Sequence, residues 1–345
     1  LIVTKKEIEE SKKMIDQRIL SSLKFAIKRI KDYHKRQIPK NDFFKDKHGI
    51  LLGGLWNPIE SVGLYVPGGT AAYPSSLIMN AVPAIVAGVK RIVITVPAIN
   101  GVLNPVILAC ANLLGIKEIY KIGGAQAIAA LAMGTKKIRK VDKIVGPGNA
   151  FVARAKKEVF GDLGIDMVAG PSEVSVVADR TADPDLVAAD LIAQAEHDVN
   201  AQSILITNNT GLVQSVNLSL KKQLSKLPKK KIASKSLKNF GLAVITDSKK
   251  KILKIINTIA PEHLELCTNF NKEIIKGVKN AGSIFIGKNS PEAMGDYLAG
   301  PNHVLPTSGS ARFSSGLSVN DFLKRHSLIK ITKTGIERLG SSVIN

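Results

Sequence analysis

The sequence predicts an α/β fold made of two doubly wound parallel sheets covered by helices. Short runs of β-branched residues alternate with helical segments of small residues, which is the pattern of parallel strands joined by crossover helices. The alternation occurs in two successive series, and this indicates two α/β units. A chain of 345 residues with 45% hydrophobic residues and 28 glycines has enough material for both cores.

The first series follows a helical segment at 5–31 and a loop. Its expected strands lie at 61–66, 91–96, 117–122 and 142–146. Its expected helices lie at 75–88, 104–115, 125–134 and 149–161. Glycine-rich turns such as "YVPGGT", "IGGAQA" and "VGPGNA" join them, and glycine permits a close approach of the backbone.

The second series has expected strands at 173–179, 202–207, 242–246, 263–267 and 282–287, again with helices between them. Dinucleotides bind at the carboxyl edge of such sheets, where glycine-rich turns lead into helices. Because the chain contains no G-x-G-x-x-G motif, the turns alone leave open whether they bind a nucleotide or only pack helix against strand.

The charge balance is strongly basic, with a net charge of +21. The lysines are spread along helix faces, and the one dense run, at 221–238, has no interleaved aromatic residues that could stack on bases. A solvated lysine-rich surface is favoured over a nucleic-acid interface, so we expect no nucleic-acid partner.

The cysteine content indicates a reducing, cytoplasmic compartment rather than a secreted protein. Two cysteines, Cys110 and Cys267, exclude a disulfide framework or a cysteine-rich zinc site. The longest apolar stretch is interrupted by polar and charged residues, including Asn80 and Lys90, so no membrane span is expected.

A polar pair stands at the end of an expected helix in "QAEHDVNAQ". Gln194 and His197 are three residues apart and share a face, and Asp296 in "GDYLAGPNHVLPT" could join them to make a mixed set of nitrogen and oxygen ligands. Spacing alone leaves two interpretations open, a buried hydrogen-bonded pair or half of a zinc site.

A carboxylate and an imidazole are adjacent in "APEHLEL", just before a strand. Glu262 and His263 offer two bases suited to different proton transfers, although they could equally form a loop hydrogen bond. A thiol route through Cys267 is disfavoured, because this residue and Cys110 lie in apolar strand and helix patterns typical of core positions.

Several longer motifs occur in the order found in histidinol dehydrogenases. They are "GLYVPGGTAAYPSS", "GGAQAIAALA", "VDKIVGPGN", "GIDMVAGPSEV", "QAEHD", "APEHLEL", "GDYLAGPNHVLPT" and "ARFSSGLSVNDFLKR". The chain resembles this family from about residue 5 to its end. The resemblance implies oxidation of L-histidinol to L-histidine through an enzyme-held aldehyde with two NAD, the last steps of histidine biosynthesis. It also implies a zinc-dependent homodimer.

The resemblance assigns roles to individual residues. Gln194, His197 and Asp296 resemble the family's zinc ligands, and Glu262 and His263 resemble its catalytic acid–base pair. The substrate would contact Ser172, Gln194, His197, His263 and Asp296, and NAD would contact Tyr65, Gln126 and Asn149. The cofactors are therefore Zn²⁺ and NAD. Zinc is expected to position the imidazole and amine of histidinol.

The resemblance also implies two Rossmann-like domains, one inserted in the other, with small helical terminal segments. We expect a first domain at 1–64 and 173–318, an inserted second domain at 65–172, and the start of a truncated C-terminal helical segment at 319–345. The family's fourth zinc ligand is a histidine in a C-terminal tail beyond this chain. We therefore expect a fragment whose own activity is impaired. A zinc-dependent hydrolase and a basic nucleic-acid-binding module are the alternative functions.

Overall fold

The computed structural model describes residues 1–68 and 73–345, and it divides into two units. Unit 1 consists of Leu1–Asp166 together with Ser318–Asn345, and unit 2 is Met167–Leu317. Part of the turn "YVPGGT" falls at 69–72, outside the described residues. Each unit contains its own five-stranded sheet, as the sequence predicts.

The sheet of unit 1 is parallel throughout, with its first strand in the middle. The order is β5-β4-β3-β6-β7. The strands are β3 (Ser61–Tyr65), β4 (Arg91–Val96), β5 (Glu118–Lys121), β6 (Lys143–Val145) and β7 (Gly164–Ile165). Chain order therefore reverses between β3 and β6, and it is at such a reversal that parallel sheets bind ligands.

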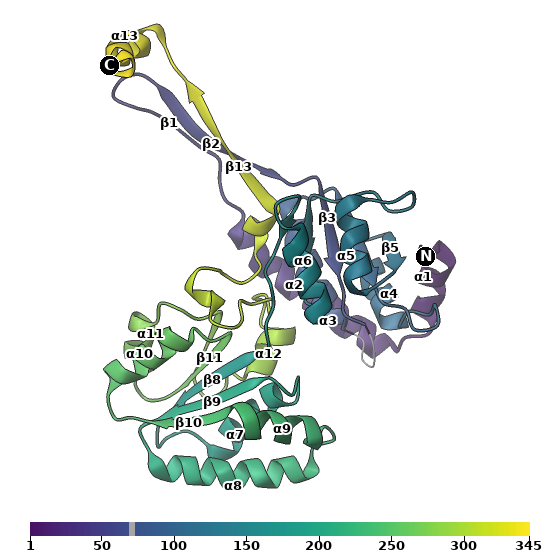
Figure 1. The fold of residues 1–345 in the computed structure, drawn as a ribbon, viewed down its shortest axis with the longest axis vertical. Coiled ribbons are helices and arrows are strands. Elements are labelled where there is room, and N and C mark those ends of the chain that lie inside the picture. Colours follow the sequence, from purple (N-terminus) through teal and green to yellow (C-terminus); the bar gives the residue numbers. More distant parts are fainter. Residues whose placement is uncertain (69–72) are drawn as a thin grey trace. The chain divides into compact units, whose positions relative to one another are not determined.

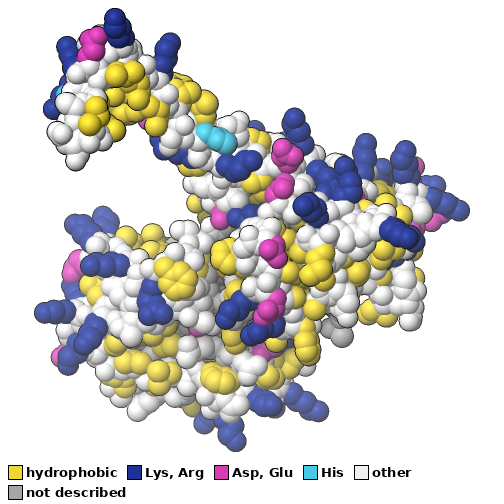
Figure 2. All heavy atoms as spheres, turned by 45° about the horizontal axis from the view of Figure 1, so that its top comes forward, with side chains coloured by type: hydrophobic (Ala, Val, Ile, Leu, Met, Phe, Trp, Pro, Cys, Tyr) yellow, Lys and Arg dark blue, Asp and Glu magenta, His cyan; other side chains and the backbone are white. Residues whose placement is uncertain are grey.

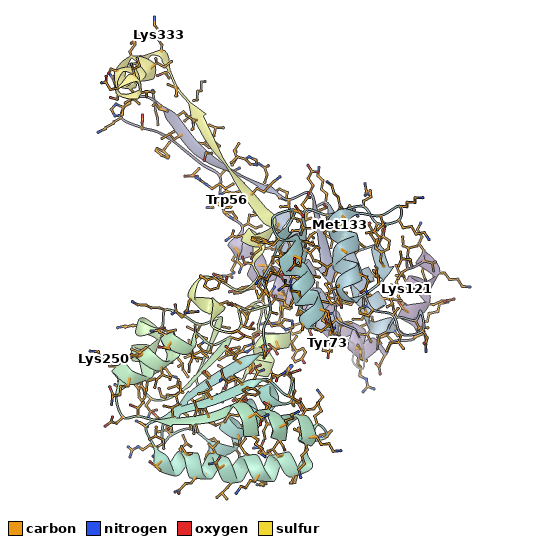
Figure 3. All side chains as sticks on the ribbon, viewed as in Figure 1. Trp56, Tyr73, Lys121, Met133, Lys250 and Lys333 are labelled. Atoms are coloured by element: carbon orange, nitrogen blue, oxygen red, sulfur yellow. The ribbon has the colours of Figure 1, made fainter. Side chains whose placement is uncertain are left out.

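Helices cover both faces of this sheet. They are α1 (Lys5–Lys13), α2 (Gln17–His34), α3 (Pro74–Ala87), α4 (Pro105–Leu113), α5 (Gly124–Met133) and α6 (Ala150–Val159). The expected helix at 5–31 is thus two helices, because Asp16 caps the second by accepting the Arg18 N–H. An ion pair between Lys121, at the end of β5, and Glu7 ties α1 to the sheet (Figure 3).

The sheet of unit 2 repeats the same topology, in the order β10-β9-β8-β11-β12. Its strands are β8 (Glu173–Ala178), β9 (Gln202–Thr207), β10 (Gly241–Ile245), β11 (His263–Cys267) and β12 (Ser283–Ile286). Its helices are α7 (Pro184–Ala195), α8 (Thr210–Lys226), α9 (Lys230–Phe240), α10 (Lys249–Ile259), α11 (Asn271–Gly277) and α12 (Glu292–Tyr297). Alternate residues of β8 and β11 pack against α7 on one face and α10 on the other.

Unit 1 also contains an antiparallel arm, which the sequence analysis does not predict (Figure 1). Its strands are β1 (Asp42–Lys45), β2 (Leu51–Pro58) and β13 (Leu323–Lys330), and α13 (Lys333–Ile344) follows them. Trp56 lies on β2 and Lys333 begins α13 at the far end of the arm (Figure 3). Residues 319–345 are therefore a short turn, a strand and a helix, not a purely helical segment.

The division of the chain also differs from the expected one. Residues 61–65 form the central strand of unit 1, hydrogen-bonded to β4 and β6, so they cannot belong with 173–318. The inserted part is Met167–Leu317, which interrupts unit 1 between Asp166 and Ser318. In the structure unit 2 interrupts unit 1, whereas the expected division has 65–172 interrupting the domain that contains 173–318.

No helix among the described residues is long and apolar enough to cross a membrane. Lysine and arginine side chains are scattered over the visible face instead of gathering in one patch (Figure 2). This distribution fits a solvated basic surface, as the sequence predicts.

Candidate active site

The candidate residues of unit 2 gather at the amino ends of its central strands. Ser172 directly precedes β8, and Glu262 directly precedes β11, which begins at His263. His263 pairs in register with Val174 of β8, so these starting points are neighbours. Since α7 runs antiparallel to β8, its last turn, which contains Gln194, ends at the same edge.

Three metal-ligating side chains converge beside this edge. One ligand atom from each of His197, Glu292 and Asp296 lies within 4.8 Å of the others. Gln194 is fully buried, and within the described part of the chain neither its amide oxygen nor its amide nitrogen has a hydrogen-bond partner. An unpartnered buried amide is unfavourable, and an oxygen ligand to a cation would satisfy it.

The surroundings of His263 determine which ring nitrogen carries the proton. Its Nδ1 lies 3.3 Å from the carbonyl oxygen of Glu173, which can only accept a hydrogen bond. Nδ1 is therefore the donor, and Nε2 holds the lone pair. Among the described residues Nε2 has no hydrogen-bond partner, and it lies 3.9 Å from Oδ1 of Asp296. His263 is thus oriented with a free acceptor directed into the site.

Glu262 is held by the neighbouring strand. Its Oε2 accepts the backbone N–H of Glu173 at 3.0 Å, and Ser172 also hydrogen-bonds its side chain. Burial raises the pKa of Glu262 to about 8 despite these hydrogen bonds, which favour the carboxylate. The backbone of Glu173 therefore orients both Glu262 and His263, through its N–H and its C=O respectively.

Burial shifts the other ionisable groups of the site toward their neutral forms. The pKa of Asp296 is raised to about 6, and that of Glu292 lies well above its usual range. Burial lowers the pKa of His263 to about 3 and that of His303 to about 4. A divalent cation binds imidazole through its unprotonated nitrogen, and its positive charge compensates the repulsion between closely spaced carboxylates. A cation in this site would therefore stabilise the ionised forms of Asp296 and Glu292.

A cavity of about 370 Å³ opens beside this cluster within unit 2. His263, Asp296 and His303 line its polar side, and Phe285 and Leu305 contribute apolar surface. His303 is fixed by its Nδ1, which lies 3.0 Å from the backbone oxygen of Asp296. The cavity can hold a small polar molecule with one apolar face.

The two cysteines do not provide a reactive thiolate. Cys110 is fully buried, and burial raises its pKa to about 12. The pKa of Cys267 is also about 12, first because of burial and then because of the nearby Glu265 and Asp190 carboxyl groups. The expectation that both are packing residues agrees with these environments.

The candidate cofactor residues lie in unit 1, at the carboxyl edge of its sheet. Tyr65 ends β3, and its hydroxyl accepts the backbone N–H of Gly124 at 3.1 Å. Gln126 is exposed in the first turn of α5, and Asn149 caps α6. All three lie at or just after strand ends, at the edge where parallel sheets bind dinucleotides.

Glu292 and His303 are the two residues of the cluster that the sequence analysis does not assign. A signal for Glu292 is present, because it lies four residues before Asp296 in "PEAMGDY", and such a spacing places two carboxylates on one helix face. The spacing alone cannot show that this face is buried. Only the packing of α12 against β11 does so, with the Glu292 N–H donating to Glu265.

Comparisons with known proteins give the same family over nearly the whole chain. Residues 1–345 match the family described as Histidinol dehydrogenase. The chain is 52% identical over 344 residues to the histidinol dehydrogenase of Rhizobium meliloti (strain 1021), covering 100% of this chain and 79% of the relative. It is 55% identical over 338 residues to the histidinol dehydrogenase of Rhodopseudomonas palustris, covering 98% of this chain and 78% of the relative. The crystal structure of histidinol dehydrogenase from Elizabethkingia anophelis matches with a TM-score of 0.97 at 40% identity, covering 99% and 79%. The chain belongs to the histidinol dehydrogenase family.

Proposed function

We propose that the cluster at the amino edge of the unit 2 sheet is where this enzyme oxidises L-histidinol. The protein is an NAD-dependent oxidoreductase of histidine biosynthesis, as its family membership establishes. The assignment of the site rests on one observation: a buried imidazole, a buried carboxyl group and a metal-ligating cluster meet at one edge, beside a cavity of about 370 Å³.

Gln194, His197 and Asp296 would hold zinc, and Glu292 lies close enough to join them. The fit rests on the donor set, which combines one imidazole with oxygen ligands, and on the unpartnered amide of Gln194. Zinc would supply a fixed positive charge and an anchor for the imidazole and amine of histidinol. The orientation of the reacting carbon then depends on this chain's own residues.

In the first oxidation, His263 would act as the general base. Its Nε2 accepts the hydroxyl proton of histidinol while a hydride leaves the same carbon for the nicotinamide ring, which gives the aldehyde, NADH and a protonated His263. The protonated ring lies beside carboxyl groups that can compensate its charge, with Glu292 Oε1 3.6 Å from Nδ1. Release of that proton to solvent restores the base.

In the second oxidation, Glu262 would activate water. The aldehyde must first gain a water molecule, and the Glu262 carboxylate can accept a proton from that water as its oxygen attacks the carbonyl carbon. Hydride transfer from the hydrate to a second NAD then gives the carboxylic acid. Glu262, just before β11, and His263, its first residue, would thus serve two different proton transfers.

Unit 1 would bind NAD through Tyr65, Gln126 and Asn149. The reversal of strand order between β3 and β6 supports this placement, because Tyr65 ends β3 and Asn149 follows β6. Helix α6 begins directly after Asn149, so the positive end of its dipole lies at this turn, where it favours a phosphate group.

A second copy of the chain is the partner that we propose for the arm. Large apolar side chains are exposed there, including Phe43, Phe44, Ile329 and Ile336, each more than half exposed. Apolar side chains grouped on one antiparallel arm are typical of a surface that is covered by a partner. The homodimer would therefore form at least in part through this arm.

Removing a metal ligand should empty the site. We expect Gln194→Ala and His197→Ala to weaken zinc binding by at least about 10–100-fold, which is the loss usual for groups that only support a ligand. Gln214, on the exposed side of α8 and outside the arm, provides a matched control substitution to alanine. Zinc content after dialysis measures the effect, and parent-level zinc in both ligand variants would show that the metal lies elsewhere.

Zinc binding should also depend on pH in a defined direction. Because the pKa of Asp296 is raised to about 6, zinc must displace a proton from this carboxyl group below that pH. The apparent zinc affinity should rise with pH, roughly tenfold per unit below pH 6 and less steeply above it. Titration calorimetry in two buffers of different ionisation enthalpy measures the released protons. An affinity that is flat between pH 5 and 7 would contradict the ligand role of Asp296.

A further inference from the structure

A buried ion pair in unit 1 contacts the first residue of the turn that leads to Asn149. Lys156 lies on α6 and Asp166 follows β7, and their side chains are 3% and 1% exposed. Both also bond the backbone of one residue, Gly146. The Gly146 N–H donates to Asp166 Oδ2 at 2.8 Å, and the Gly146 carbonyl accepts from Lys156 Nζ at 3.0 Å. Both backbone groups of Gly146 are therefore held by this pair.

Gly146 cannot be replaced or moved without affecting Tyr65. It has a φ of +117°, and a Cβ at this position would collide with the Tyr65 carbonyl oxygen. Tyr65 and Gly146 directly follow the paired residues Leu64 and Val145, at the reversal of strand order between β3 and β6. The ion pair thus fixes the backbone where β3 and β6 end.

The other end of the turn is fixed independently. The side-chain oxygen of Asn149 accepts the N–H groups of Phe151 and Val152, both at 3.1 Å. Residues 146–149 are therefore anchored at Gly146 by the ion pair and at Asn149 by the helix cap. A turn restrained at both ends is preorganised for a ligand, and preorganisation increases affinity.

Stability alone is a weak explanation for this pair. A buried ion pair is commonly replaceable by apolar residues with little loss of stability, because desolvation offsets the attraction between the charges. We propose that Lys156 and Asp166 are a positioning pair, which holds the turn at 146–149 in the conformation that binds the dinucleotide cofactor. The inference rests on the proposed placement of NAD in unit 1.

The test is NADH binding by the double variant K156M/D166L, in which no buried charge is left unpaired. It should fold, as shown by circular dichroism, and bind NADH about 10–100-fold more weakly, the loss typical of a displaced positioning group. The amide of Gly146, which loses its acceptor on Asp166, should exchange faster with solvent. Zinc content, which depends on unit 2, should not change. Parent-level NADH affinity in the folded variant would overturn the inference.

A matched control is R91M/E118L, which removes an ion pair of 2.8 Å at the amino ends of β4 and β5, at the opposite edge of the same sheet. It should leave NADH affinity at the parent level. A second variant, K156M/D166N, keeps an oxygen acceptor for the Gly146 N–H and also leaves no buried charge unpaired, so it carries the test if the first double variant does not fold. K156M/D166N should weaken NADH binding by less than K156M/D166L, and unchanged binding would count against the pair.

N149A distinguishes failure of the inference from failure of the proposed cofactor site. Weaker NADH binding in N149A with parent-level binding in K156M/D166L would overturn the positioning pair and leave the site in place. Parent-level binding in both would overturn the site, and the inference with it.

Discussion

His263→Ala should lower kcat for the oxidation of histidinol by about 10²–10⁴-fold, the contribution typical of a positioned general base. The Glu173 carbonyl engages Nδ1 at 3.3 Å, so Nε2 is the ring nitrogen that remains to accept the hydroxyl proton. The alcohol step should then limit turnover. Histidinol deuterated at the reacting carbon should therefore show a larger primary isotope effect with the variant than with the parent enzyme.

His263→Asn is the more conservative variant, because its amide can still donate toward the Glu173 carbonyl but provides no base. It should lose as much activity as the alanine variant, whereas Gln214→Ala, an exposed site on α8, should keep the parent rate. Histidinol oxidation near the parent rate in either His263 variant would exclude this residue as the base.

Glu262→Gln should spare the alcohol step and slow the oxidation of supplied histidinal by about 10²–10⁴-fold. The amide oxygen can still accept the Glu173 N–H that Oε2 accepts at 3.0 Å, so the loss would be chemical and not structural. Separate steady-state measurements with histidinol and histidinal provide the comparison. Equal damage to both steps in the Glu262 and His263 variants would refute the division of roles.

The pH dependence of the histidinal step gives an independent check. Burial raises the pKa of Glu262 to about 8, and only the ionised carboxyl group can act as a base. The rate should therefore increase as pH rises toward 8 in the parent enzyme, and the Glu262→Gln variant should lack this increase. A bound cation shifts the midpoint downward, because it favours the carboxylate.

Most of the fold is predictable from the sequence because parallel strands buried on both faces read as continuous β-branched runs. β4 and β9, for example, coincide with the expected runs at 91–96 and 202–207. The antiparallel arm is not predictable in this way. β2 contains two adjacent glycines and a tryptophan, and its partner β13 lies more than 260 residues later, so no local pattern indicates their pairing.

Only part of the candidate site is predictable from the sequence. Its assembly depends on which helices and strands end at the amino edge of the unit 2 sheet, and spacing along the chain does not show this. Gln194 and Glu262 were identifiable as polar residues in apolar surroundings, but spacing could not show that α7 and β11 bring them to the same edge. Glu292 gave only a helical spacing with Asp296. The expected domain boundary at residues 64 and 65 differs from the structure for a similar reason, because the order of motifs along the chain does not show that β3 pairs with β6.

The most direct test of the proposed site is the number of NADH molecules that the Glu262→Gln enzyme forms for each histidinol it consumes. The reaction runs until histidinol is exhausted, and an aldehyde-trapping reagent captures any histidinal that is released. The parent enzyme, without the trap, should form two NADH for each histidinol. The variant should form one and release histidinal to the trap, because His263 still serves the alcohol step while hydration of the aldehyde lacks its base. Two NADH from the variant, or none, would contradict the assignment of the two proton transfers to His263 and Glu262.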